Sequence, residues 1–132
     1  MAGETDLDKL IALMQPKLLE RDYVFCTLTE GSQAEAADLQ PLATYQEDEG
    51  MSLLLEKARA DQAGLEYSGV FKGLTLSVHS SLEAVGFTAA VANKLAASGI
   101  SANVIAAHYH DHVFVPADRA EQALSLLTTL ES

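Results

Sequence analysis

The pattern of hydrophobic and polar positions is clearest in the last sixty residues, where it predicts the order strand, helix, strand, strand, helix. The first of these helices carries Phe87, Val91 and Leu95 on one face, and Gly99 stands where a helix end often takes a left-handed residue. Pro116 is expected at the first position of the last helix, where its missing N–H costs nothing. The predicted elements are a strand at Leu74–His79, a helix at Ala84–Ser98, a hairpin of Ser101–Ala107 with His112–Val115, and a helix that buries Ala120, Ala123, Leu124, Leu127 and Leu130.

The first half of the chain has a weaker pattern. Two apolar runs flank Glu47–Gly50, and Gly50 supplies the positive φ that a tight reversal needs, which predicts a hairpin. Thr29–Gln40 is polar and small, so we expect a loop with one helical turn. The other predicted elements are a helix at Asp6–Gln15, strands at Tyr23–Leu28, Leu42–Gln46 and Met51–Leu55, a helix at Glu56–Ala63 ended by Gly64, and a strand at Leu65–Phe71. A subdomain boundary is placed at Gly73, between two predicted strands.

The two halves of the chain repeat part of each other without a gap. A shift of sixty positions places Leu53–Leu55 on Val113–Val115 and Arg59–Ala63 on Arg119–Ala123. Strand falls on strand and helix on helix, which predicts two copies of one small α+β unit.

The composition fits one compact body or two subdomains. The chain has 132 residues, of which 48% are hydrophobic, enough for a buried core. Its net charge is −11, from 19 acidic and 8 basic residues. This charge repels phosphate backbones and anionic lipid surfaces, so neither nucleic acid nor a membrane is an expected partner. No apolar run approaches the roughly 18 residues of a membrane span and the start lacks a basic leader region, so we expect a cytoplasmic location.

Several segments of the sequence resemble a known family. They are Leu74-Thr-Leu-Ser-Val-His79, the helix opening Val85-Gly86-Phe87, Leu95–Ser101, Asp111-His112-Val-Phe-Val-Pro116 and the acidic hairpin Glu47–Met51. They resemble ACT domains, and nearly the whole chain is similar to free-standing bacterial tandem ACT proteins. The resemblance implies an α+β fold of two ferredoxin-like, βαββαβ-related subdomains, residues 1–72 and 73–132, with antiparallel sheets side by side. It also implies regulation by a small molecule, an amino acid or a similar compound, without catalysis.

Two departures from the βαββαβ order predict that the units share or exchange pieces. No strong helix follows the strand that ends at Leu28, and the last unit ends on its helix without a final strand. The helix at Asp6–Gln15 is the candidate to fill such a gap.

The candidate binding site is the turn His79–Gly86, where a strand runs into the start of a helix. Free N–H groups and a partial positive charge there attract a carboxylate, and the resemblance implies that ACT units bind amino acids at this turn, at the seam between units. An alternative is that Ser80 and Glu83 form a capping box, which satisfies the helix end without a ligand. The predicted ligand-binding residues are Ser80, Ser81, Glu83, Ala84, Val85 and Gly86, with His110 and Asp111 from the neighbouring hairpin turn.

Three alternating histidines, His108, His110 and His112, would share one face of an extended strand and could bind zinc or nickel. The hairpin has to reverse between His108 and Asp111, however, and a reversal breaks the period of two. Histidines of a surface turn are the preferred interpretation, so no metal site and no cofactor are predicted.

Catalysis is not predicted either. The lone Cys26 lies in an apolar run without an adjacent basic partner, so we expect a buried small hydrophobic residue. Glu47, Asp48 and Glu49 either contact a ligand ammonium or form a solvated hairpin tip, which does not provide the raised pKa that acid–base catalysis needs. The sequence contains no Ser–His–Asp set, phosphate loop or paired Cys motif.

The predicted function is therefore a non-catalytic regulatory protein that binds a small molecule at a seam and works as a homodimer or larger homo-oligomer. An interaction module without a ligand, which pairs through exposed sheet edges, is the alternative. A histidine-based metal enzyme is a third hypothesis, which metal analysis of untagged protein would test.

Overall fold

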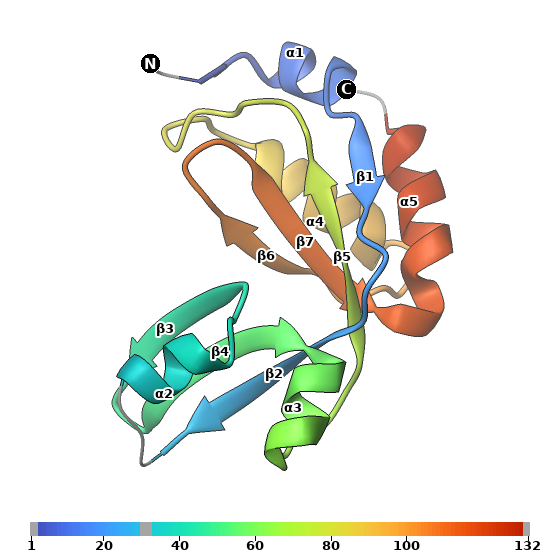
Figure 1. Ribbon diagram of the computed structural model, residues 1–132. Coiled ribbons are helices and arrows are strands. Elements are labelled where there is room, and N and C mark those ends of the chain that lie inside the picture. The colour runs from blue at the N-terminus through green and yellow to red at the C-terminus, as the bar shows by residue number, and fades with distance from the viewer. Residues whose placement is uncertain (1–2, 30–32, 131–132) are drawn as a thin grey trace. The chain divides into compact units, whose positions relative to one another are not determined.

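The computed structural model describes residues 3–29 and 33–130 (Figure 1). Contacts divide the chain into two compact units. Met1–Glu20 with Lys72–Ser132 is called the terminal unit here, and Arg21–Phe71 the middle unit. Both have the α+β composition and antiparallel strands that the sequence predicts. The first twenty residues, which the sequence analysis groups with the first subdomain, have their contacts in the unit that holds the C-terminal half.

The terminal unit is a sheet with helices on one face. In its described residues the strands lie in the order β1–β5–β7–β6, and β1 with β5 and β6 with β7 are antiparallel pairs. Its elements are α1 (Leu7–Ala12), β1 (Pro16–Leu18), β5 (Phe71–Leu76), α4 (Phe87–Ala96), β6 (Asn103–Ala106), β7 (Asp111–Pro116), a 3₁₀ turn (Ala117–Arg119) and α5 (Ala120–Thr128). By contacts, the first residue of β5 belongs to the middle unit.

Alternation along the strands decides which face of this sheet the helices cover. Leu74 and Leu76 of β5, with Val113 and Val115 of β7, belong to one buried cluster with apolar residues of α1, α4 and α5. Figure 1 shows where these strands and helices lie in the terminal unit. The buried residues of this core are Leu10, Ile11, Met14, Leu74, Leu76, Phe87, Val91, Leu95, Ile100, Val113, Val115, Ala120, Ala123 and Leu127. The apolar stripe predicted for the first helix of this half is thus confirmed.

A strand from the N-terminal segment completes the terminal unit. Leu18 lies opposite Leu74 in the antiparallel pair of β1 and β5, and Leu19 N donates to Gly73 O at 2.8 Å. β1 therefore takes the place of the final strand that the βαββα order lacks. The expected exchange of pieces is confirmed for this unit, although the piece that fills the gap is β1 and not the helix before it.

The middle unit is a smaller sheet with the strand order β3–β4–β2. Its elements are β2 (Tyr23–Leu28), α2 (Gln33–Asp38), β3 (Ala43–Glu47), β4 (Gly50–Glu56) and α3 (Lys57–Ala63). The core of this unit consists of Val24, Cys26, Ala36, Leu53, Leu55 and Ala60. The helical turn expected within Thr29–Gln40 is α2, and residues 30–32 of that segment lie outside the described part.

Residues that the sequence repeat places sixty positions apart are buried in both units. Leu53–Leu55 of β4 and Val113–Val115 of β7 are all buried, and a helix follows each strand. Ala60 in α3 and Ala120, the first residue of α5, are again sixty positions apart and are both buried. The sequence echo therefore marks positions that have the same packing role in the two units.

The predicted strand Leu65–Phe71 is wrong. Gly64 ends α3 in the left-handed conformation, as expected, but the chain then has no regular structure until Phe71, which pairs with Tyr23. Leu65, Tyr67 and Val70 pack against the middle core instead. The Ser-Gly pair inside the segment weakens a strand, since glycine brings no side chain to pack.

Two boundaries predicted near glycines also differ from the structure. Gly73 lies inside β5, and a Cβ there would be 2.7 Å from Phe114 Cε2, so this glycine makes room for a ring and does not separate strands. The helix expected from Ala84 begins only at Phe87, because Gly86 takes a φ of +94° that a helix cannot contain. Pro116 ends β7 and precedes the 3₁₀ turn.

Candidate functional site

The first half of the predicted binding turn is held by buried hydrogen bonds. Ser80 Oγ donates to Asp111 Oδ2 at 2.7 Å, and the two residues are 5% and 7% exposed. His110 Nδ1 lies 3.4 Å from the carbonyl oxygen of Val78. The structure thus brings Ser80, His110 and Asp111 together, because the turn between β6 and β7 lies against the start of the loop that joins β5 to α4.

The second half of the turn is open to solvent. Leu82 and Val85 are 67% and 84% exposed, and Glu83 is exposed beside them. Ser81 Oγ accepts a hydrogen bond from Glu83 N at 3.1 Å, which fixes a local turn. Two large apolar side chains at a loop tip are available for contact with a ligand or another chain.

The capping box of Ser80 and Glu83 is wrong. The N-cap residue of α4 is Gly86, which offers no side-chain hydrogen bond, while the Ser80 hydroxyl is used by Asp111. The start of α4 therefore has N–H groups without a side-chain cap. The backbone of Gly86 is in the left-handed region, and a Cβ there would lie 3.3 Å from Leu7 Cδ2. A side chain at this position would therefore meet both backbone strain and a close contact.

The N-terminal segment lies on the same turn. Glu4 N donates to His79 O and Ser81 N donates to Glu4 O, both at 2.9 Å. A Cβ on Gly3 would stand 2.6 Å from the carbonyl carbon of Ser80, so a glycine is required for this approach. Two backbone groups of the predicted site are therefore occupied by the chain itself.

The histidines of the hairpin do not converge. Tyr109 lies between them, with ring centroids 5.2 Å from His79 and 4.8 Å from His108, and the rings of His110 and His112 are 6.5 Å apart. Residues 3–29 and 33–130 contain no group of three or more His, Cys, Asp or Glu that could hold a metal ion. The arrangement matches an aromatic surface turn.

His112 differs from the other histidines because it lies within β7. Its Nδ1 is 3.1 Å from Thr75 Oγ1. Burial lowers the pKa of His112, and the neighbouring His110 lowers it further, whereas Asp111 acts in the opposite direction. The neutral imidazole is thus favoured in the folded state.

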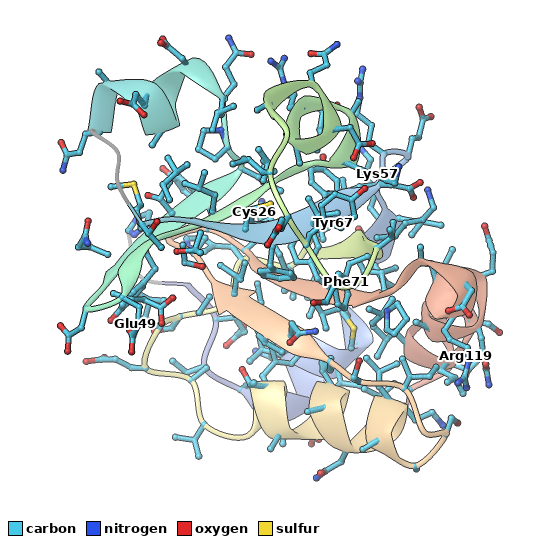
Figure 2. All side chains as sticks on the ribbon, turned by 90° about the horizontal axis from the view of Figure 1, so that it is seen from below. Cys26, Glu49, Lys57, Tyr67, Phe71 and Arg119 are labelled. Atoms are coloured by element: carbon cyan, nitrogen blue, oxygen red, sulfur yellow. The ribbon has the colours of Figure 1, made fainter. Side chains whose placement is uncertain are left out.

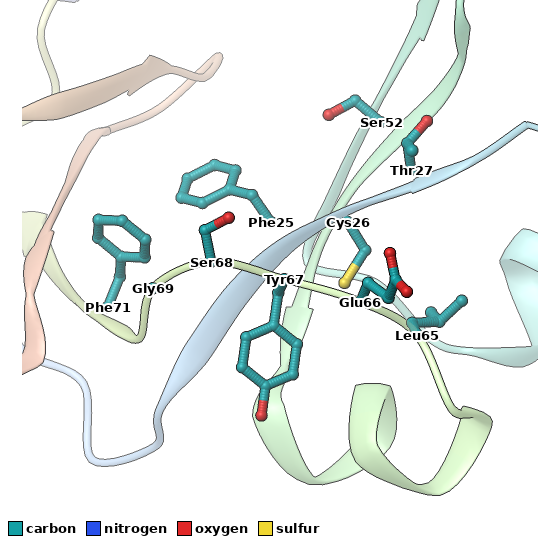
Figure 3. A pocket seen from close by; sticks show the side chains of 10 residues that line it. All are labelled: Phe25, Cys26, Thr27, Ser52, Leu65, Glu66, Tyr67, Ser68, Gly69 and Phe71. Carbon is teal, nitrogen blue, oxygen red and sulfur yellow. The ribbon is translucent and has the colours of Figure 1, made fainter.

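A cavity of about 980 Å³ on the middle unit was not predicted (Figure 3). Its lining consists of Phe25, Cys26, Thr27, Ser52, Leu65, Glu66, Tyr67, Ser68, Gly69 and Phe71. The rings of Phe25 and Phe71 meet edge to face with centroids 5.3 Å apart. The cavity was not foreseen because residues 65–71 were expected to form a strand. The Ser68-Gly69 pair was the available signal against that strand.

A hydrogen bond to a surface ion pair of α3 holds the segment that borders this cavity. Tyr67 Oη donates to Asp61 Oδ1 at 2.7 Å, and Lys57 Nζ lies 2.9 Å from Asp61 Oδ2. The Tyr67 hydrogen bond, followed by that of Lys57, lowers the pKa of Asp61. These contacts tie the chain after α3 back to the helix.

The remaining predicted polar groups have structural roles. Cys26 is a buried free thiol among the side chains of the middle unit (Figure 2), and burial raises its pKa, so it is a poor nucleophile. Glu47, Asp48 and Glu49 are exposed, and Glu49 stands at the outer end of the β3–β4 hairpin (Figure 2). The acidic cluster is thus a solvated hairpin tip.

The repeat and the shared βαββα order define a tandem of two ferredoxin-like units, one of them completed by β1. The chain belongs to the ACT domain family, because ACT domains match residues 2–72 and 72–129. This confirms the tandem ACT arrangement inferred from the sequence. The ACT architecture is regulatory in character. None of the helices in the described parts of the chain is long and apolar enough to cross a membrane.

Solved structures support the same fold. A Vibrio cholerae protein of unknown function, described as a possible transport protein, is 52% identical, with 96% of each chain covered and a TM-score of 0.86. A protein from Agrobacterium tumefaciens is 18% identical over 87% of each chain, with a TM-score of 0.67. The regulatory subunit of aspartate kinase from Thermus thermophilus, in its ligand-free form, is 13% identical over 89% of this chain and 96% of its own, with a TM-score of 0.64. No curated protein matches the chain.

Proposed function

We propose that this chain is a non-catalytic regulatory protein of the cytoplasm that binds an amino acid, or a similar small carboxylate, at the turn His79–Gly86. The observation that carries the proposal is the uncapped start of α4 beside the buried hydrogen bond from Ser80 to Asp111. The helix start attracts the carboxylate, and the hydrogen bond pre-positions the loop that presents it. Glu83, exposed on the same loop, is the group that meets a ligand ammonium.

The regulatory role is supported by the family and by the aspartate kinase regulatory subunit, which shares the fold. The exposed side chains of Leu82, Val85 and Tyr109 support a site completed by a second copy in a homodimer or larger homo-oligomer. Ligand binding would then favour one association state over another, because a ligand shifts an equilibrium by its difference in affinity for the two states.

Thermal unfolding against a panel of amino acids and related carboxylates tests the proposal. A ligand at about 100 times its dissociation constant stabilises the folded state by roughly 2.7 kcal/mol, which is several degrees for a chain of this size. We expect one chemical class to raise the midpoint selectively. A flat panel up to several millimolar would refute ligand binding and leave the interaction module as the better explanation.

Two substitutions at one exposed position localise the site. Val85→Asp should weaken binding of a carboxylate and Val85→Lys should retain or strengthen it, because Val85 is 84% exposed next to the start of α4. Both changes remove the same apolar side chain, so each serves as the control for the other. Equal affinity of the two variants for the ligand would show that it binds elsewhere. Gly86 is less suitable, since its φ of +94° and the nearby Leu7 Cδ2 make any substitution there strained, which would confound a loss of binding.

A further inference from the structure

The segment that borders the cavity of the middle unit is held at both ends. Leu65 N donates to Ala60 O at 3.0 Å at one end, and Phe71 pairs with Tyr23 at the other. Between them, the side chain of Tyr67 packs against the middle core and its hydroxyl is bound to α3. The cavity of about 980 Å³ is therefore formed by the folded chain itself. Pre-formed cavities of about 300–1,000 Å³ are typical of small-molecule sites.

Aromatic rings form one end of this cavity. The rings of Phe25 and Phe71 are in edge-to-face contact, and a Cβ at Gly69 would lie 3.2 Å from Phe71 Cε1. The glycine thus makes room for the Phe71 ring against the backbone of the segment. Figure 3 shows the two rings at one end of the lining, and Glu66 with Leu65 at the other. The aromatic end can bind an apolar or aromatic group.

The charge of the lining disfavours an anion. Glu66 is the only charged residue among the ten that line the cavity, which include no Lys, Arg or His. Its side chain is exposed, and it has no ion-pair partner in the part of the chain that the structure describes. Residues 21–71 contain ten acidic and three basic residues, a net charge of −7. A carboxylate or a phosphate is repelled here, whereas a cation is attracted.

Three hydroxyl groups complete the polar part of the lining. Thr27 and Ser52 lie opposite each other in the pair of β2 with β4, so their side chains share one face of the sheet, and Ser68 belongs to the bordering segment. None of the three hydroxyls has a hydrogen-bond partner among the described residues. A protonated amine has three N–H donors, which hydroxyl and carboxylate oxygens accept. The polar groups of the cavity therefore match an ammonium group.

We propose that the cavity of the middle unit binds a small organic cation, a protonated primary amine that carries an apolar or aromatic body. The body packs against the rings of Phe25 and Phe71, and the ammonium group lies towards Glu66 at the other end. This site is separate from the carboxylate site proposed on the terminal unit, and its charge requirement is the opposite. Each site can therefore fail its own test without affecting the other.

Three probes with the same ring and the same length of chain test the charge requirement on the full-length protein. They are phenylbutylamine, the neutral phenylbutanol and the anionic phenylbutyrate. In calorimetric titrations we expect the amine to bind at least about threefold more tightly than the alcohol, because an exposed ion pair contributes a factor of up to about five. Phenylbutyrate should bind most weakly in this cavity.

A substitution of Glu66 localises the ammonium group. Glu66→Gln removes the charge and keeps the size of an exposed side chain. Glu49→Gln is the matched control, since it removes the same charge from the same unit at the hairpin tip, outside the lining. We expect the affinity for phenylbutylamine to fall at least about threefold in Glu66→Gln and to stay unchanged in Glu49→Gln. Equal affinity of the two variants for the amine would overturn the proposal.

Amide chemical shifts of the wild-type chain locate the probes without any substitution. The amides of Thr27, Ser68 and Gly69 should shift when phenylbutylamine is added. Those of Ser81 and Val85, in the proposed carboxylate site, should not. No shift at Ser68 and Gly69 with millimolar amine, shifts confined to the terminal unit, or an equal response of the cavity to phenylbutyrate would each overturn the proposal.

Discussion

Replacing Gly3 by alanine should detach the N-terminal segment from the turn of the proposed carboxylate site. A Cβ there would lie 2.6 Å from Ser80 C, 2.7 Å from Ser81 N and 2.8 Å from His79 O. All three neighbours are backbone atoms, which cannot rotate away as a side chain would. The segment itself has to move, and the two hydrogen bonds that Glu4 makes to the turn are lost.

The size of the effect follows from those two bonds. Each contributes about 0.5–1.5 kcal/mol net, so local opening should become easier by about 1–3 kcal/mol, a factor of about 5–150. Amide hydrogen exchange read at Ser81 measures this directly, because its N–H donates to Glu4 O. Thr5→Ala is the control, since it changes an exposed neighbouring side chain and leaves the backbone contact intact.

The comparison has a clear refuting result. If the Ser81 amide exchanges at the same rate in folded Gly3→Ala as in wild type, the segment does not protect the turn. The amide of Ala90, bonded to Gly86 O inside α4, should keep its rate in both variants, and a parallel rise there would indicate general destabilisation instead of local release.

Two further predictions concern the terminal unit. Gly73→Ala should lower the free energy of unfolding by about 1–3 kcal/mol, because the new Cβ meets the buried ring of Phe114. Adding Phe114→Leu to this variant should recover part of the loss in urea unfolding. Additive effects of the two substitutions would contradict the close contact. Burial is the largest cause that lowers the pKa of His112, so this imidazole binds a proton more readily in the unfolded chain than in the folded one. The contribution of neutral His112 to stability is therefore full above about pH 6.5, and it is lost as the pH falls through that value towards the folded pKa. His112→Gln should flatten this dependence between pH 7.5 and 5.5 in thermal unfolding, and an unchanged slope would exclude His112 as its source.

The elements with strong periodicity could be predicted from the sequence. β2 has the predicted bounds, and Phe87, Val91 and Leu95 are buried in α4 as their spacing requires. Strand β1 was missed because three residues give no measurable alternation and Pro16 had the appearance of a helix end. Its role depends on pairing with β5, a contact between distant parts of the chain that no local pattern contains.

The candidate site was predictable only in part. The closeness of Ser80 and Asp111 follows from the order of strands, since the turns after β5 and β6 come to the same end of the sheet. Their hydrogen bond could not be foreseen, because a Ser-x-x-Glu sequence equally fits a capping box, and the left-handed Gly86 is what delays the helix. The contact of Gly3 and Glu4 with the turn at His79–Ser81 has no sequence signal, since an isolated β-bridge of two backbone hydrogen bonds requires no hydrophobic or polar pattern.

The completion of the terminal unit by β1 makes the middle unit an insertion within it. Leu18 and Leu74 are partners although they are 56 positions apart in the sequence. During synthesis the middle unit can fold once Phe71 is available, whereas β1 has to wait for β5 and β7. A circular permutant that starts at Arg21, with a linker joining residue 132 to residue 1, would carry two uninterrupted units in succession. In it β1 would follow α5, and the second unit would have the full βαββαβ order of a ferredoxin-like domain.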